Sequence, residues 1–445
     1  MECKVNEGSA FYIKECYICI MKVWFIGAVL LAGCMTACNL DKITIKDPIK
    51  VSSPQPKTQI TKVSLTEAEA AMVNAGNELT FNMMPLLREG EKSFLFSPLS
   101  LQYALGMTAN GASGQTLEEI VKALGFGTDL DALNALCHKL LNELPAVDLD
   151  VKLQLADAIL VNDKYPLLPS FKENVESTYY AAVENMSFDD PAYVAARIND
   201  WAKRNTNGLI DKMLDAGDVS PAAISFLMNA LYFKAPWVSK GSDPRFMKEN
   251  TKNQEFYPGG CDVLQVPMMH SSGVYKYADF DDFRVLELPY ASGKFSMYIL
   301  LPEGELNSLM QDFPSLDWKE IRSKLKERDV ELNLPKFETS SSFRLNDALQ
   351  RLGMQRAFTG AAQFDRMFAD PDVQACIDFV IQKARISVAE WGTEAAAVTV
   401  VGMKEFSMGP GEEPPVEFIC DHPFAYLIAE NTSGTILFAG AYCGN

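Results

Sequence analysis

The sequence predicts an α+β fold, with helices in the first third of the chain and strands in its second half. Apolar residues recur at helical spacing up to Leu144, whereas after Phe256 short runs rich in Val, Ile, Tyr and Phe alternate with Gly and Asp turns. Helices first and strands later favour an α+β domain over a repeated βαβ arrangement. We see no internal repeat, and no second boundary interrupts residues 63–445. A single large domain is therefore expected there.

Helical patterns come first along the chain. The first runs from Leu65 to Leu87, with Thr66 positioned to cap it and with Glu67 and Glu69 in the first turn, near the positive end of the helix. Pro98 opens a second pattern, because proline is well tolerated at the first helical position. This second helix is expected over 98–111, and further helices over 116–124, 130–144, 170–179 and 193–204.

Strand patterns follow. Apolar residues alternate with polar ones from Val151 towards Val161, and a buried strand is expected from Ile224 to Lys234. Other strands are expected at 275–277, 283–288, 295–301, 330–337, 377–389, 424–429 and 435–442.

Composition argues against an enzyme and against a nucleic-acid partner. The formal net charge is −18, and no basic run is interleaved with aromatic residues, so the surface is expected to repel nucleic acid. The chain holds 3 histidines, and none lies in a G-x-S-x-G, H-E-x-x-H or P-loop pattern. Cysteines are widely scattered, without metal-ligand spacing. We therefore expect no catalytic residue, no metal and no cofactor.

The N-terminus has the pattern of an export signal. Met21 and Lys22 precede a short apolar stretch from Val23 to Leu31, which is too short to span a bilayer. Leu31-Ala32-Gly33-Cys34 resembles a bacterial lipobox, in which Cys34 becomes the lipid-modified first residue. We expect residues 1–33 to form a signal-peptide region whose true start is Met21, and residues 34–62 to form a flexible, lipid-anchored tether. The expected protein is an exported bacterial lipoprotein, with the periplasmic and outer-surface faces both open.

Near the C-terminus, a segment able to form a strand is tethered to a loop. At period 2, small or β-branched residues fall on one face of this segment, namely Thr393, Ala395, Ala397, Thr399 and Val401. Residues 402–415 then read as exposed loop, because Gly and Pro recur within them. A strand-forming segment joined to a loop that proteases can cut suggests a conformational trap.

Five ordered motifs resemble those of the serpins, the serpin-type protease inhibitors. Glu390 to Ala397 resembles the family's hinge. The others are Phe96-Ser97-Pro98-Leu99-Ser100, Asn229-Ala230-Leu231-Tyr232-Phe233-Lys234-Ala235-Pro236-Trp237, Leu334-Pro335-Lys336-Phe337 and Asp421-His422-Pro423-Phe424. Together they cover about residues 63–445, so the chain resembles a bacterial lipoprotein-type inhibitory serpin.

The resemblance implies a fold and a mechanism. The serpin fold packs a helix-rich N-terminal part on a large central sheet, with two smaller sheets and an exposed reactive centre loop, here about residues 391–415. The implied function is suicide inhibition of serine proteases by a monomer: the protease cuts the loop, forms an acyl-enzyme and is trapped in a covalent complex when the loop inserts into the central sheet. Papain-like cysteine proteases are further candidate targets. The alternative is a non-inhibitory serpin that acts as a binding or carrier module, for which the bulky Trp391 is the one favouring feature.

The resemblance also assigns site residues. Family spacing places the reactive bond between Phe406 and Ser407, which suits chymotrypsin-like proteases, with alternatives at Met403, Lys404 and Met408; Lys404 would suit trypsin-like enzymes. The hinge residues are Glu390, Gly392, Thr393, Glu394, Ala395, Ala396 and Ala397. The shutter, the polar cluster beneath the strands that open, matches Ser97, Ser100 and Asn229, while Gln382 replaces the family's common histidine. The breach, where the loop enters the sheet, matches Trp237, Lys336 and Glu390, and we expect an ion pair between the last two.

Overall fold

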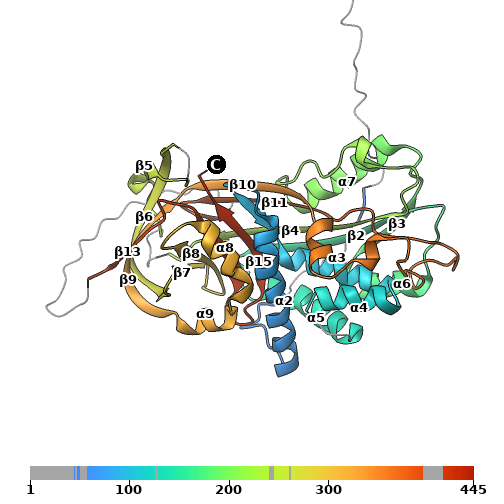
Figure 1. Cartoon of the computed structure of the whole chain (residues 1–445), viewed down its shortest axis with the longest axis horizontal. Coiled ribbons are helices and arrows are strands. Elements are labelled where there is room, and N and C mark those ends of the chain that lie inside the picture. Colours follow the sequence, from blue (N-terminus) through green and yellow to red (C-terminus); the bar gives the residue numbers. More distant parts are fainter. Residues whose placement is uncertain are drawn as a thin grey trace, which may run out of the picture. The chain divides into compact units, whose positions relative to one another are not determined.

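The computed structural model describes residues 45, 48–50, 58–125, 129–239, 245–259, 262–393 and 414–444. Residues 47–445 form one compact unit, separate from residues 1–46. Figure 1 shows this unit as helices packed around two β-sheets. The α+β prediction is confirmed.

The first sheet has six strands in the order β10-β11-β12-β4-β2-β3. β11 and β4 are both antiparallel to the two-residue strand β12, so they run parallel to each other. Within the described part of the chain, β12 is the only strand that joins them. The strand bounds are Lys152–Asn162 for β2, Ala182–Met186 for β3, Ser225–Pro236 for β4, Phe337–Arg344 for β10, Ile381–Ala389 for β11 and Gly392–Thr393 for β12.

The second sheet has nine strands in the order β1-β15-β14-β8-β7-β6-β9-β13, with β5 paired to β6. The resemblance implies two smaller sheets, but here their strands join into this one continuous sheet. The reason is β6, whose 16 residues pair with β5, β7 and β9. The bounds are Phe94–Phe96 for β1, Lys252–Phe256 for β5, Leu264–Asp279 for β6, Phe283–Tyr290 for β7, Phe295–Pro302 for β8, Lys326–Pro335 for β9, Val416–Ile419 for β13, Phe424–Glu430 for β14 and Ile436–Tyr442 for β15.

Helices cover both faces of the six-stranded sheet: α3 to α6 lie on one side of β2 and β4, and α7 lies on the other (Figure 1). The predicted cap of α2 is confirmed, because the Thr66 hydroxyl accepts from the Glu69 amide at 3.2 Å and the Glu69 carboxylate accepts from the Thr66 amide at 2.7 Å. The α-helices are α2 Glu67–Leu87, α3 Pro98–Gly111, α4 Gly114–Ala123, α5 Leu130–Glu143, α6 Pro169–Tyr179, α7 Pro191–Asn205, α8 Leu306–Asp312, α9 Trp318–Lys324 and α10 Asn346–Arg351. Short 3-10 turns lie at Leu144–Ala146, Ala216–Asp218, Lys248–Asn250, Phe313–Ser315 and Arg356–Phe358.

A small apolar core joins α7 to the six-stranded sheet. Trp201 and Ile198 of α7 pack with Phe226 and Met228 of β4. Ile49 belongs to the same core and is 1% exposed, and its carbonyl accepts a hydrogen bond from Arg204 at 3.3 Å. Ile49, within the 34–62 segment expected to form a flexible tether, therefore packs against the domain.

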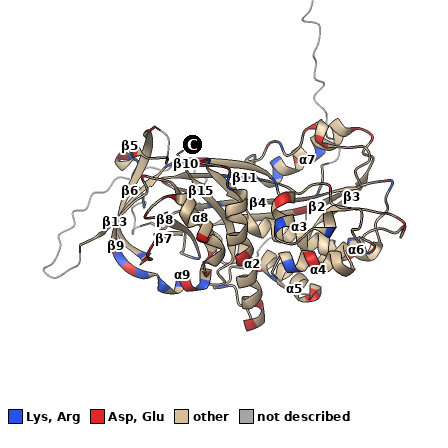
Figure 2. Ribbon diagram, in the orientation of Figure 1, with Lys and Arg blue, Asp and Glu red and all other residues tan. Residues whose placement is uncertain are grey.

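Charged residues of both signs are interspersed on the surface. Figure 2 shows Lys and Arg alternating with Asp and Glu along β9, in the sequence Lys326-Glu327-Arg328-Asp329. Among the described residues, no helix combines the length and the apolar character needed to cross a bilayer. Of the cysteines described, Cys137, Cys420 and Cys443 are buried and Cys376 is exposed, all as free thiols.

Candidate functional site

The chain turns sharply from β11 into β12, and this turn inserts the start of the hinge between two strands. Gly392 pairs with Ala389 of β11 and with Pro236 of β4, while Thr393 pairs with Val388 and Ala235. Gly392 has φ +141°, and a Cβ atom there would fall on the carbonyl oxygen of Ala235. Glycine is therefore required where the chain enters the sheet.

Thr393 is held inside the sheet. It is 2% exposed and shares the inward face with Val388 and Ala235, its paired residues. Its hydroxyl is hydrogen-bonded to the Tyr290 hydroxyl at 2.6 Å, and burial raises the pKa of that tyrosine. The first inward-facing residue of the loop thus sits in a buried site shaped for a small hydroxyl side chain.

Trp237 connects β4 to the hinge turn. Its indole N–H donates to the Ala389 carbonyl at 2.8 Å, and its backbone N–H donates to the Trp391 carbonyl at 3.0 Å. The indole stacks on Tyr290, with ring centroids 4.3 Å apart and planes 13° from parallel. Trp391 itself is half-buried.

Lys336 and Glu390 form the expected ion pair. The Lys336 ammonium lies 3.1 Å from the Glu390 carboxylate, whose other oxygen accepts from the Thr251 hydroxyl at 3.1 Å. Burial alone would raise the pKa of Glu390, but hydrogen bonds from its own backbone, Lys336 and Thr251 together with the Lys336 charge lower it below 4.5. Glu390 is thus an anion that ties the hinge turn to the junction between β9 and β10.

The structure also brings the shutter residues together. The Ser100 hydroxyl donates to the Asn229 side-chain oxygen, and the Ser100 amide donates to the Ser97 hydroxyl at 3.1 Å. Gln382 of β11 forms a reciprocal pair with the Ser97 backbone, accepting from its N–H and donating to its carbonyl, both at 2.8 Å. An amide fills both roles without a change of charge, so this contact does not titrate.

Asp157 of β2 is a member of this cluster that the sequence reasoning missed. It lies directly opposite Asn229 in the β2–β4 pairing, is 1% exposed, and accepts from the Asn229 side-chain amide at 2.6 Å. A carboxylate within the apolar run from Leu153 to Val161 was the available signal, since charged residues are rarely buried without a role.

A cavity of about 440 Å³ lies beside the shutter. Its walls include residues of β4 and of the segment that leads into β11. Further along the sheet, towards the hinge turn, β12 lies between β4 and β11. Ser100, Asn229 and Gln382 supply polar lining, and Phe226 and Phe379 supply apolar lining. The space between β4 and β11 is thus partly open below the point where β12 ends.

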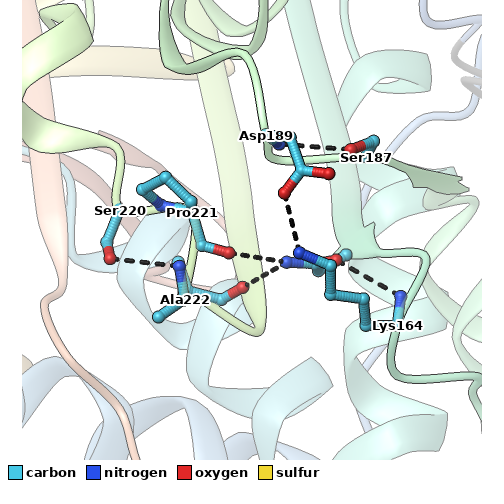
Figure 3. A network of polar contacts seen from close by, with 8 residues as sticks. Lys164, Ser187, Asp189, Ser220, Pro221 and Ala222 are labelled. Atoms are coloured by element: carbon cyan, nitrogen blue, oxygen red, sulfur yellow. Dashed lines mark hydrogen bonds and ion pairs between the residues drawn. The ribbon is translucent and has the colours of Figure 1, made fainter.

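A polar network fixes the segment just before β4 to the end of β2 (Figure 3). The buried Asn162 side chain donates to the carbonyls of Pro221 and Ala223 at 3.2 and 3.0 Å. Nearby, Lys164 donates to Asp189 at 2.7 Å, in the loop before α7 (Figure 3). β2, β4 and α7 are therefore linked at this end of the sheet.

The remaining site residues named from the sequence lie outside the described residues. These are Cys34, the hinge residues Glu394, Ala395, Ala396 and Ala397, and the candidate reactive-bond residues Met403, Lys404, Phe406, Ser407 and Met408. Among the described residues, no cluster of His, Cys, Asp and Glu suited to a metal ion is present.

Comparison with known proteins identifies the family. Residues 74–444 match the family model described as serpin (serine protease inhibitor). An uncharacterized serpin-like protein of Thermococcus kodakarensis is 34% identical over 375 residues, which are 84% of this chain and 85% of that protein. The native state of the thermophilic serpin tengpin superposes with a TM-score of 0.76 at 26% identity, covering 88% of this chain and 98% of that one. Thyroxine-binding globulin in complex with thyroxine superposes with a TM-score of 0.73 at 26% identity, covering 84% and 99%. The helices, the central mixed sheet and the second sheet form the serpin fold, and the chain is a member of the serpin family.

Proposed function

We propose that this serpin is a suicide-substrate inhibitor of serine proteases, which traps the acyl-enzyme when its cut loop inserts between β11 and β4. The observation that carries the proposal is β12. Gly392 and Thr393 already occupy the first two positions of a central strand, with partners on both sides. Below them, no described strand joins β11 to β4. The sheet can therefore accept one more antiparallel strand along the same line.

The register of β12 supports a path for the rest of the hinge. If the inserted strand kept the same register, Ala395 would lie opposite Ile386 and Phe233, and Thr399 would lie opposite Gln382 and Asn229. Ile386 and Gln382 are buried and point to the inward face, as Val388 does. The small and β-branched residues of the segment would then fill the inward face, which a bulky or charged residue would not fit.

Insertion would move the protease far from its point of attack. The segment 393–406 has fourteen residues, and at about 3.3 Å per residue it extends roughly 46 Å as a strand. The ester carried at its end travels with it. Misplacing catalytic groups by about 1 Å costs on the order of 100-fold in rate, so a distorted protease would leave the ester uncleaved.

The proposed reactive bond joins Phe406 to Ser407. An aromatic residue before the bond suits chymotrypsin-like proteases, while cleavage after Lys404 would recruit trypsin-like ones. The alternative cleavage sites are Met403 and Met408, and papain-like cysteine proteases are further candidate targets.

Incubation with chymotrypsin tests the proposal. We expect a band of summed mass on denaturing gels, absent when the protease serine is chemically blocked, together with a rise in the melting temperature of the cleaved protein. Mass spectrometry after denaturation locates the cut bond through the mass of the C-terminal fragment. Cleavage without a covalent band, and without a rise in melting temperature, would mean that the loop does not insert.

Cleavage without a covalent complex would favour the alternative, a non-inhibitory serpin that acts as a binding module. Two observations support this alternative: thyroxine-binding globulin shares the fold, and the half-buried Trp391 lies beside the hinge. Replacement of Trp391 by Ala separates the candidates, because recovery of the covalent band in this variant alone would show that the indole blocks insertion.

We also propose that the protein is an exported lipoprotein held at a membrane through Cys34. The supporting pattern is Leu31-Ala32-Gly33-Cys34 after a short apolar stretch. In bacterial cells, Cys34→Ser should move the protein from the membrane fraction to the soluble fraction and abolish incorporation of labelled palmitate.

A further inference from the structure

Within the described part of the chain, one buried carboxyl group of the six-stranded sheet has no charged partner. Asp157 sits on the inward face of β2, where its strand neighbours Leu155 and Ile159 are apolar core residues. One carboxylate oxygen accepts from Asn229, and the other is buried without a partner among the described residues. Such a group is costly in its charged form, because no cation or second donor replaces the lost water.

The carboxyl group ends a chain of hydrogen bonds that crosses the shutter. Ser100 of α3 donates to the Asn229 oxygen, and the Asn229 amide donates to Asp157. The chain therefore joins α3 to β4 and β4 to β2. Separation of β4 from β11 would disturb its first link, because Asn229 lies on β4 whereas the Ser97 cap of α3 is hydrogen-bonded to Gln382 of β11.

Burial shifts the titration of this carboxyl group into the neutral pH range. Asp157 acts on three titratable groups, Tyr103 of α3, Cys137 of α5 and Tyr179 of α6, and burial is the main cause that raises the pKa of each. Burial likewise raises the pKa of Asp157 from 3.8 to about 7, although the Asn229 hydrogen bond lowers it. Burial therefore outweighs the Asn229 bond.

We propose that Asp157 is a positioning residue for the opening of the sheet, which becomes easier when its carboxyl group loses its proton. The inference rests on the proposed insertion of the loop. In the closed sheet the carboxyl group is buried, and widening of the cavity that Asn229 lines would let water reach the carboxyl group beside this residue. The charged form is therefore better tolerated in the open state than in the closed one.

The direction of the pH effect follows from proton linkage. The closed state binds the proton more tightly than a hydrated state does, so opening releases a proton and is favoured by rising pH. The fraction of closed molecules with a charged Asp157 rises about tenfold between pH 6 and pH 8 when the pKa is about 7. Opening that requires the charged form should accelerate by up to about the same factor.

The test measures opening without a protease. An acetylated synthetic peptide with the sequence of residues 393–406 is added to the intact, uncut protein. Because this sequence lacks Trp, the rate at which the peptide binds is followed by the tryptophan fluorescence of the protein from pH 6 to pH 8. The peptide carries only Glu, Lys and a terminal carboxyl group as titratable groups, none of which changes charge in that range. Its binding requires a gap between β4 and β11.

We expect the rate for the natural protein to rise several-fold, up to about tenfold, and the rate for Asp157→Asn to change by less than about twofold. Asp148→Asn is the matched control, because Asp148 is also buried but contacts Ser292, and it should retain the natural pH profile. The three histidines are present in both variants, so they cannot account for a profile lost in one of them.

The outcomes are distinct. Peptide binding that is flat from pH 6 to pH 8 in the natural protein overturns the role of Asp157, even if Asp157→Asn fails to fold. The same holds if Asp157→Asn keeps the full pH dependence. Absence of peptide binding at every pH, combined with no covalent protease complex, instead overturns the proposed function on which this inference rests.

Discussion

Thr393→Arg tests the insertion mechanism most directly. Thr393 is 2% exposed between β11 and β4, and its hydroxyl is bonded to Tyr290 at 2.6 Å. An arginine here would have to bury a guanidinium group at a site lined by Val388 and Ala235. The substitution therefore opposes insertion while leaving the proposed reactive bond, thirteen residues further on, unchanged.

The magnitude follows from the burial of the charge. An uncompensated buried charge costs about 3 to 5 kcal/mol, which dominates the roughly 1 kcal/mol from the lost Tyr290 hydrogen bond. If the cost falls on the insertion step, insertion slows by about two to nearly four orders of magnitude. Hydrolysis of the acyl-enzyme would then be faster than loop insertion, and the variant would behave as a substrate.

The assay is a titration of chymotrypsin with increasing serpin, read as residual protease activity. We expect the natural protein to reach full inhibition near equimolar amounts and Thr393→Arg to require a large excess. Glu394→Arg is the matched control, because continuation of the β12 register would put this neighbour on the outward face, opposite Ser387 and Lys234, where a cation would stay in water. Equal inhibition by Thr393→Arg and Glu394→Arg would refute the inferred register.

Four further predictions concern the hinge turn and the loop. Gly392→Val should expel the hinge from the sheet, because a Cβ atom there meets the Ala235 carbonyl, and hydrogen exchange at Thr393 should rise while trapping slows. Lys336→Ala should lower stability by about 1 kcal/mol in a urea titration and change the loop-insertion rate, and an unchanged rate would refute a gating role. Because the pKa of Glu390 lies below 4.5, its stabilising contribution is full above that pH and is lost as the pH falls through the lowered pKa, so melting curves from pH 5 to pH 3 should fall more steeply for the natural protein than for Glu390→Gln. Phe406→Arg should transfer inhibition from chymotrypsin to trypsin, measured as association rates with both enzymes.

Much of the fold could be predicted, because long periodic segments carry a local signal. α2 begins at Glu67, two residues after the predicted start at Leu65, because Thr66 caps the helix as the sequence predicts. The strand β10 was missed beyond Phe337, because its sequence Ser340-Ser341-Ser342 has no apolar alternation. Its strand geometry comes from eight paired positions with β11, which no local pattern encodes.

The candidate site was predictable only where a motif named it. Lys336 and Glu390 were paired in advance because both lie in motifs that resemble the family. Tyr290 was not, since it is 103 positions from Thr393 and lies in no quoted motif. The burial of Asp157 depends on how α3, α5 and α6 pack over β2, so neither its place in the shutter nor its raised pKa could be read from its neighbours in sequence.

The position of β14 and β15 within the nine-stranded sheet decides what happens to the two pieces of a cut chain. All fourteen of their residues are buried, and β1 and β8 flank the pair on either side. A break between Phe406 and Ser407 would leave residues 407–445 locked into the molecule as a second polypeptide. The nicked protein should therefore elute as one particle in native gel filtration, and its smaller chain should separate only in denaturant.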